Sequence, residues 1–221
     1  MPGMHTVQQG EHMSGIAQQY GFSDYNTIWN DPNNAALQAQ RQNPNVLNPG
    51  DQVYIPDKTA GSYSGATDQQ HKFTSAVKPL TLQVTLQQMY YEPIANKSCQ
   101  LTVGLDQWNV TSDGNGLVQH SISKTATDAT VTVNDTITVE GASVPWQIEL
   151  DFKIGSLDPI DQQSGQVARL ANLGYYRGSL DTVDATELES AVEEFQCDNG
   201  LDLDGICGPA TQAKLKDVYG C

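Results

Sequence analysis

Apolar residues recur with a helical period near both ends of the chain and with a period of two in its middle. An N-terminal helix is indicated by apolar positions at i, i+3, i+4 and i+7, with Gly21 just after them as a C-cap. Those positions are Met13, Ile16, Ala17 and Tyr20. Short strands at 5–8 and 52–55, and short helices at 25–29 and 34–41, complete a β-α-α-β pattern.

The middle of the chain is rich in threonine and valine. Residues 80–87 alternate apolar and polar side chains, which predicts a half-buried antiparallel strand. The sequence SDGNG at 112–116 predicts a tight hairpin turn. Further strands are expected at 99–103, 117–121, 130–133 and 146–152. Short strands separated by turn signals favour a small β-sandwich.

Helical periodicity returns after Asp158. A helix is expected at 166–173, ended by Gly174. A second helix begins at Asp184, whose side chain and that of Glu187 form a capping-box-like pair. Its apolar face consists of Leu188, Ala191, Val192 and Phe195, and Gly200 closes it. Pro209 suits the first turn of a third helix, so the sequence predicts a small three-helix bundle.

These patterns predict a multidomain protein. A small α+β domain occupies 1–57, and the polar, aperiodic stretch at 58–72 is a flexible linker. An all-β sandwich then occupies 73–155, and a helical domain occupies 156–221.

The formal net charge of −15 makes nucleic acid a poor partner, because such binding depends on neutralising phosphates. An anionic membrane surface is disfavoured for the same reason. Membrane insertion is not expected, since no apolar run approaches the ~20 residues of a spanning helix. The N-terminal sequence has neither a basic start nor an apolar region, so we expect no signal peptide and synthesis in the cytoplasm.

No set of residues indicates catalysis. The histidines, His5, His12, His71 and His120, occur in no nucleophile–base or HExxH context. The cysteines show no zinc spacing. We therefore expect no enzyme activity, no catalytic residue, no metal site and no cofactor.

The stretch FQCDNGLDLDGICGPAT at 195–211 resembles a calcium loop in composition only. Aligning Asp202, Asp204 and Gly205 with an EF-hand loop places Gly200 at its first ligand position and Thr211 at its last. Neither residue fits, so the glycines are interpreted as turns between helices.

The four cysteines are Cys99, Cys197, Cys207 and Cys221. Two alternatives remain open for them, reduced thiols or a disulfide among the last three in an oxidising compartment. Cys197 and Cys207, ten residues apart, are the candidate pair.

The first domain resembles the LysM family through HTVQQGEHMSGIAQQYGF at 5–22 and NPNVLNPGDQVYIP at 43–56. Glu11 replaces the family's usual aspartate, and the span at 30–42 is longer than in most members. The resemblance implies a groove that binds the N-acetylglucosamine backbone of peptidoglycan or chitin. Its sides would be Gly10, Glu11, His12 and Met13, and Asn43, Pro44, Asn45, Val46 and Leu47. The alternative is a LysM-like docking platform for another protein.

The sandwich resembles a transthyretin-like (carboxypeptidase regulatory) module over residues 91–118, which implies a spacer or docking role. The last domain resembles the peptidoglycan-binding domain found beside cell-wall hydrolases. VARLANLGYYRG at 167–178 and ELESAVEEFQCDNGLDLDGICGPATQAKL at 187–215 carry that resemblance. The implied glycan contacts are Leu173, Tyr175, Tyr176, Asp204 and Gly205.

The junction at 146–176 resembles the one in LysM–sandwich–peptidoglycan-binding proteins encoded beside the spikes of type VI and related contractile secretion systems. This resemblance implies delivery to the periplasm or outside the cell. Three functions follow: a non-enzymatic peptidoglycan-binding accessory, an adaptor that docks a spike or effector without binding glycan, or a wall-targeting subunit for a separate hydrolase.

Overall fold

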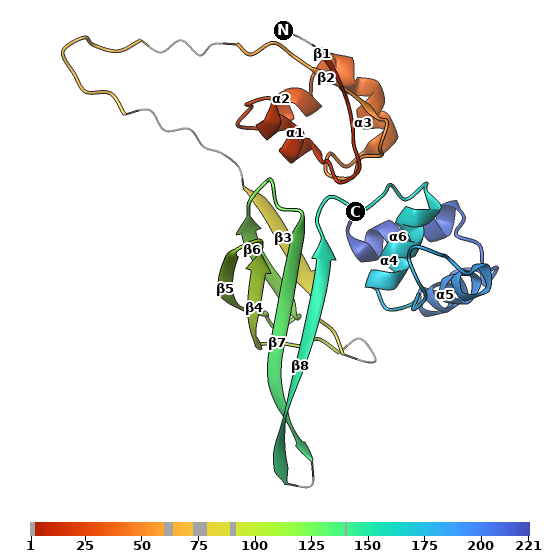
Figure 1. Ribbon diagram of the computed structural model, residues 1–221. Helices are drawn as coiled ribbons and strands as arrows, with labels where there is room; N and C mark the ends of the chain where they lie inside the picture. The colour runs from red at the N-terminus through yellow and green to blue at the C-terminus, as the bar shows by residue number, and fades with distance from the viewer. Residues whose placement is uncertain (1–2, 60–63, 73–78, 89–91, 140) are drawn as a thin grey trace. The chain divides into compact units, whose positions relative to one another are not determined.

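The computed structural model describes residues 3–59, 64–72, 79–88, 92–139 and 141–221 (Figure 1). In these ranges the chain forms six α-helices, one 3₁₀ helix and eight strands. The protein is therefore a mixed α/β chain with several sheets, and its parts are described one at a time. None of the helices in the described ranges combines the length and apolar character needed to cross a membrane.

The N-terminal part begins and ends with strands that pair with each other, β1 (Gly3–Thr6) and β2 (Gln52–Ile55). Between them lie four helical segments: α1 (Met13–Gln19), α2 (Asn26–Trp29), η1 (Pro32–Asn34) and α3 (Ala35–Arg41). The first strand was expected at 5–8 and lies two residues earlier. Its neighbour Val7 instead bonds to the turn before β2, with its N–H 2.9 Å from the Asp51 carbonyl oxygen.

Glycine ends α1 in the way that the sequence predicts. Gly21 has φ +71°, its N–H donates to Gln18 O at 2.9 Å, and the Phe22 N–H donates to Ala17 O at 2.7 Å. These two bonds define a Schellman motif, which satisfies carbonyls that the helix leaves open. The same pair of bonds recurs at Gly174 and at Gly200. The three predicted helix ends are confirmed.

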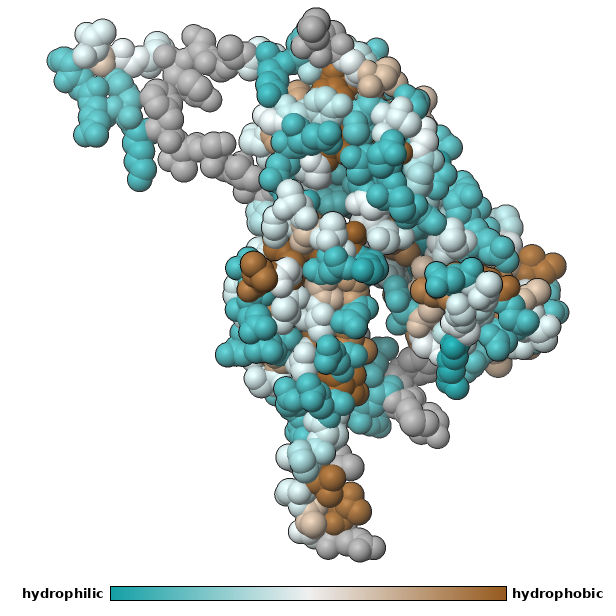
Figure 2. Space-filling model, in the orientation of Figure 1, coloured by the Kyte–Doolittle hydropathy of each residue, from teal (hydrophilic) through white to brown (hydrophobic). Residues whose placement is uncertain are grey.

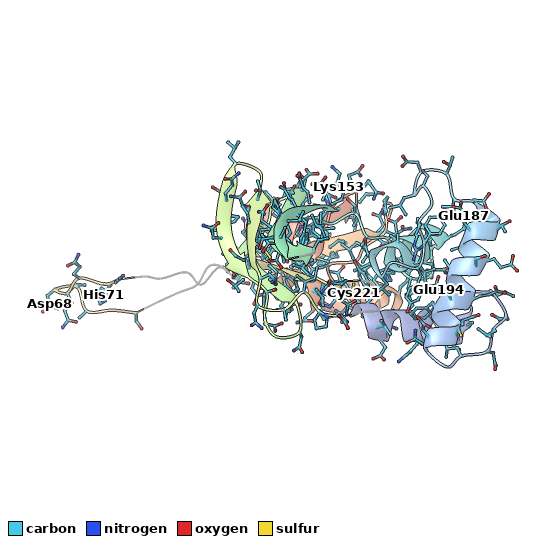
Figure 3. All side chains as sticks on the ribbon, turned by 90° about the horizontal axis from the view of Figure 1, so that it is seen from below. Asp68, His71, Lys153, Glu187, Glu194 and Cys221 are labelled. Atoms are coloured by element: carbon cyan, nitrogen blue, oxygen red, sulfur yellow. The ribbon has the colours of Figure 1, made fainter. Side chains whose placement is uncertain are left out.

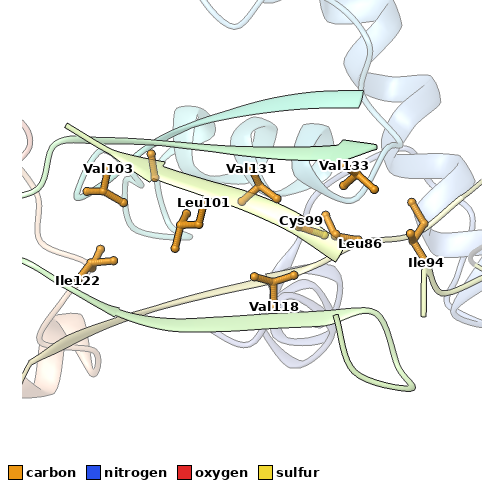
Figure 4. Close-up of a cluster of buried hydrophobic side chains, with 10 residues drawn as sticks. Leu86, Ile94, Cys99, Leu101, Val103, Val118, Ile122, Val131 and Val133 are labelled. Atoms are coloured by element: carbon orange, nitrogen blue, oxygen red, sulfur yellow. The ribbon is translucent and has the colours of Figure 1, made fainter. Parts of the chain in front are cut away.

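The middle part contains two sheets. One pairs β3 (Leu80–Thr85) with β6 (Leu117–Ile122). The other has the order β5-β4-β7-β8, with β4 at Ser98–Val103, β5 at Asp106–Thr111, β7 at Asp128–Val139 and β8 at Ala142–Lys153. Apolar side chains from both sheets meet in one buried cluster (Figure 4). Its best buried members include Leu101, Val131 and Val133.

The SDGNG segment is not a hairpin turn, because the strands that flank it, β5 and β6, lie in different sheets. Ser112 anchors the segment elsewhere. Its buried hydroxyl donates to Ile94 O at 2.6 Å and accepts from Lys97 N–H at 3.0 Å. Gly116, at φ +79°, approaches β3 so closely that a Cβ atom would lie 2.3 Å from Leu86 O. These contacts redirect the chain from one sheet to the other.

The β7–β8 hairpin is longer than the pattern at 130–133 and 146–152 predicts. β4 pairs with β7 only as far as Val133, while the β7–β8 register continues to Val139 opposite Ala142. The outer half is thus a two-stranded ribbon. Apolar residues gather at its free end (Figure 2), and Val139 and Val144 are 48% and 42% exposed.

The C-terminal part consists of α4 (Gln163–Asn172), α5 (Ala185–Asp198) and α6 (Pro209–Tyr219). Asp184 caps α5 as expected, because its Oδ1 accepts from the N–H groups of Thr186 and Glu187 at 2.9 and 3.0 Å. Pro209 occupies the first turn of α6. The helices share one buried core of Val167, Leu170, Tyr175, Tyr176, Ala191, Val192, Phe195 and Leu215.

Candidate functional site

The two tyrosines expected to contact sugar belong to the core of the C-terminal helices. Tyr175 and Tyr176 are only 9% and 3% exposed. The Tyr175 ring packs edge-on against Phe195 at 5.3 Å between centroids. Leu173 packs, partly buried, against the same core. These rings therefore offer little surface on which a sugar could stack, and glycan contact by Leu173, Tyr175 and Tyr176 stays a prediction.

Gln196 organises the loop between α5 and α6. This side chain is 1% exposed, and its amide makes five hydrogen bonds across residues 204–211. Its Oε1 accepts from the backbone N–H groups of Asp204 and Gly205, both at 3.1 Å. Its Nε2 lies 2.7 Å from Asp204 Oδ1, 3.0 Å from Thr211 Oγ1 and 3.1 Å from Ile206 O, and its two N–H groups are shared among these three acceptors. One buried amide thus connects the backbone of residues 204–206 to the first turn of α6.

We call these hydrogen bonds of Gln196 the loop clamp, and Asp204 has a structural part in it. The Gln196 amide and the Ile206 N–H, which donates at 2.9 Å, both bond to Asp204 Oδ1 and lower the pKa of its carboxyl below the usual value. Gly205 has φ +66°, and a Cβ atom there would lie 2.7 Å from Glu189 Cγ. Both residues predicted as glycan contacts therefore shape the loop. The described residues contain no group of His, Cys, Asp and Glu side chains able to hold a metal ion.

The loop presents two large apolar side chains to solvent. Leu203 and Ile206 are 62% and 64% exposed, although the residues beside them are tied to Gln196. The pattern of the sequence assigned neither residue a role.

Arg169 is the buried cation of the bundle. It is 1% exposed, and desolvation lowers its pKa from the usual value. Its guanidinium donates to the carbonyl oxygens of Asp158, Gly165 and Cys221 at 2.8 to 2.9 Å. It therefore ties the segment before α4 and the segment after α6 to α4, a structural task that leaves it unavailable to a ligand.

The geometry of these helices agrees with the comparisons to known proteins. Residues 167–215 match the model of a family described as "Putative peptidoglycan binding domain". This stretch of the chain is therefore similar to the domains of that family. The matched range runs from α4 into α6 and includes Gln196, Leu203 and Ile206. The family is a binding domain and not a catalytic one. No curated protein and no solved structure matches the chain.

The residues of the predicted LysM groove differ in exposure. Four of the nine are buried, namely His12, Met13, Val46 and Leu47. The other five, Gly10, Glu11, Asn43, Pro44 and Asn45, are partly exposed. In such a groove the buried members would act only as support, and only the partly exposed ones could touch a sugar directly. Glycan binding by this groove stays a prediction.

Two of the partly exposed groove residues already make local bonds. Glu11 Oε2 accepts from Gln8 N–H at 2.8 Å and lies 2.8 Å from His5 Nε2. Asn43 Oδ1 accepts from Asn45 N–H at 2.9 Å. A carboxylate with such partners still has lone pairs for a sugar hydroxyl. These bonds fix the loops on which the prediction depends.

A buried asparagine that the sequence pattern did not single out supports the same part of the chain. Asn34 is 1% exposed, and its amide pairs with the backbone of Tyr54 in β2 through two bonds of 2.8 Å. It therefore supplies the hydrogen bonds that the N–H and C=O of Tyr54 would make to a neighbouring strand, and it anchors the start of α3.

All four cysteines are free thiols in the structure, so the candidate pair Cys197 and Cys207 is not joined by a disulfide here. Cys197 is exposed, whereas Cys207 packs against the core of the peptidoglycan-binding domain. Burial raises the pKa of Cys207 to about 11, which keeps it protonated at neutral pH. Pairing of the two in an oxidising compartment stays a prediction.

Gln196 and Arg169 are the buried polar side chains that support this site and that sequence reasoning missed. A signal for each was present. Gln196 follows Val192 at i+4, and Arg169 follows Gly165 at i+4, so both polar residues occur on the buried side of a helix. A polar side chain at a core position requires hydrogen-bond partners, which is the role that both have.

Proposed function

We propose that the chain binds peptidoglycan through its C-terminal domain, as a non-enzymatic accessory protein. The observation that carries this proposal is the family match over residues 167–215, together with the complete three-helix core and fixed loop found there. A rigid loop on a stable bundle can recognise a repeating polymer at low entropic cost, because little is left to order on binding.

Co-sedimentation of the purified full chain with purified sacculi tests the proposal. We expect the chain to pellet with the sacculi in a saturable manner. An unrelated protein of similar negative charge is the control for trapping in the pellet. A chain that stays in the supernatant with that control contradicts the proposal.

The N-terminal domain adds a second glycan contact in this proposal, through residues 10–13 and 43–47. Two linked modules on one polymer bind more tightly than either alone, since the second contact is intramolecular. Asn45→Ala and Glu11→Gln change partly exposed groove residues without emptying the core. A drop in sacculus affinity of at least threefold supports the second contact, and unchanged affinity contradicts it.

A second candidate function is that of a protein adaptor, and the β7–β8 ribbon favours it. Val139, Val144 and Ile148 are all more than a third exposed, and β8 is an edge strand. Exposed apolar side chains on an open edge are typical of docking surfaces. The partner would be the spike or an effector of a contractile secretion system. A wall-targeting subunit for a separate hydrolase is a variant of the same idea.

Co-purification with the neighbouring spike protein tests this candidate. We expect Val144→Asp to abolish capture of the spike while sacculus binding persists. Absence of any spike in the purified material contradicts the adaptor function.

The cellular setting is part of the proposal. The junction at 146–176 supports a link to type VI or related contractile secretion. The chain would be made in the cytoplasm and delivered by that machine to the periplasm or outside. Detection of the protein in the secreted fraction of a wild-type strain, and its loss when the sheath is deleted, tests this part.

A further inference from the structure

The loop between α5 and α6 combines a rigid backbone with exposed apolar side chains. Single exposed leucines and isoleucines are common on soluble proteins and need no explanation. Here two of them, Leu203 and Ile206, occur within four consecutive residues. The backbone of the last three, residues 204–206, is hydrogen-bonded to Gln196. The bonds from the buried Gln196 amide hold the backbone beside these two side chains in place, and both side chains extend into solvent.

The surroundings of the loop are acidic. Asp202 and Asp204 lie within it and are exposed, and Gly205 packs against the side chains of Glu189 and Glu193 of α5. Further carboxylates, including Glu187 and Glu194, project from the same helix (Figure 3). An anionic ligand would be repelled here, whereas hydroxyl and amide groups could donate to the free carboxylate oxygens.

Peptidoglycan offers two chemically different parts to such a surface. Its stem peptides carry free carboxylates. Its glycan strand is a chain of N-acetylated sugars, each with an apolar C–H face and hydroxyl donors. We propose that Leu203 and Ile206 contact the glycan strand and that the domain does not bind the stem peptide. This inference rests on the proposed function, because it assigns the part of peptidoglycan that the C-terminal domain binds.

Leu203 and Ile206 thereby replace Tyr175 and Tyr176 as the apolar contacts. Aliphatic side chains can cover the C–H face of a sugar, and burying them yields free energy roughly in proportion to the apolar area removed from water. Asp204 keeps its Oδ2 for a sugar hydroxyl, since the bonds to Gln196 and Ile206 use Oδ1.

The test measures binding of the full chain to two polymers, intact sacculi and glycan strands freed of peptide by an amidase. We compare the wild type with Leu203→Ser combined with Ile206→Ser. Leu105→Ser is the matched control, because Leu105 is a fully exposed leucine in the turn between β4 and β5. Hydrogen exchange in α5 and α6 verifies that the double variant is folded.

We expect the wild type and Leu105→Ser to bind both polymers with similar affinity, and the double variant to bind each at least fivefold more weakly. A wild type that binds sacculi but not peptide-free strands overturns the inference and leaves the proposed function standing. Equal affinity of the folded double variant and the wild type overturns it in the same way. Failure of the wild type to bind sacculi at all contradicts the proposed function itself.

Discussion

Replacing Gln196 by methionine should unfold or loosen the C-terminal domain without creating a large cavity. Methionine has the same unbranched shape but no amide, so it removes the hydrogen bonds and retains most of the packing. The change removes the bonds that five groups on the loop and on α6 make to Gln196. Two of these groups keep another partner, since Asp204 Oδ1 still accepts from the Ile206 N–H and the Asp204 N–H still donates to Asp202 O. One of these groups is the hydroxyl of Thr211, a residue that is 4% exposed.

The size of the effect follows from these contacts. A hydrogen bond contributes about 1 kcal/mol, and a buried group left without a partner costs more than one that water can reach. Most of the five groups lie on an exposed loop, so the total should be about 2–4 kcal/mol and not the full sum. A domain of this size has a stability of about 3–10 kcal/mol at typical values per residue. The hydrogen bonds of the loop clamp thus contribute a large part of the stability of the domain.

Hydrogen exchange of the full chain is the suitable assay, since it reports on α5 and α6 separately from the other parts. We expect amides in these helices to exchange about thirty to a thousand times faster in the variant, at about 1.4 kcal/mol per factor of ten. Gln212→Met is the matched control. Gln212 is half-buried and makes one bond, from Nε2 to Cys207 O at 2.9 Å. Its loss should accelerate exchange less than about tenfold.

A charge swap then separates hydrogen bonding from packing. Gln196→Glu places a carboxylate against Asp204 and should destabilise the domain as much as methionine does. Adding Asp204→Asn restores an amide–carboxylate pair and should recover about 1 kcal/mol or more in a double-mutant cycle. Unchanged exchange in Gln196→Met, or strict additivity in the cycle, would refute the clamp.

Three further results are expected. Gly165→Ala should destabilise α4 by about 2 kcal/mol or more, because the new Cβ would lie 2.2 Å from Pro159 O. An unchanged melting temperature would contradict this and would show that the backbone at Pro159 moves aside at little cost. Cys207 should react with iodoacetamide at pH 8 about a hundredfold more slowly than an ordinary thiol, because its pKa is raised to about 11. Exposed Cys197 should react first, and equal labelling rates of the two in peptide mass spectrometry would contradict this. The clamp should also weaken in acid. Since the folded pKa of Asp204 is lowered, its stabilisation is present above the unfolded value of ~3.9 and disappears as the pH falls below it. Asp204→Asn should therefore weaken the fall of the melting temperature at low pH, measured by circular dichroism at a series of pH values. An unchanged fall would count against the bond.

The local signals in the sequence were reliable where backbone chemistry decides the structure. Gly21, Gly174 and Gly200 end helices because positive φ angles suit glycine, and Asp184 begins one because its carboxylate caps the first turn. At SDGNG the predicted tight turn forms, with the Gly116 N–H 3.1 Å from Asp113 O, but it joins two sheets and does not close a hairpin. The bonds of Ser112 to residues 94–97 determine the path of the chain here. A contact between positions so far apart in the sequence cannot be recognised from the local residue pattern.

The candidate site was only partly predictable. The position of the loop at 200–208 was found from its turn residues, but the tyrosines before it were assigned to the surface. Aromatic residues suit both a core and a sugar platform, and only packing against Phe195 decides between them. The length of the β7–β8 hairpin was missed because Asp135 interrupts the apolar series in β7, and because proline, here Pro145, argues against a strand.

The most direct test of peptidoglycan binding by residues 167–215 is a hydrogen-exchange footprint. The full chain is compared with and without soluble glycan–peptide fragments released from sacculi. We predict slower exchange in the loop at 200–208 and at the adjoining ends of α5 and α6, with no change in the strands β3 to β8. Protection confined to other parts of the chain, or no protection at saturating fragment concentration, would contradict the account.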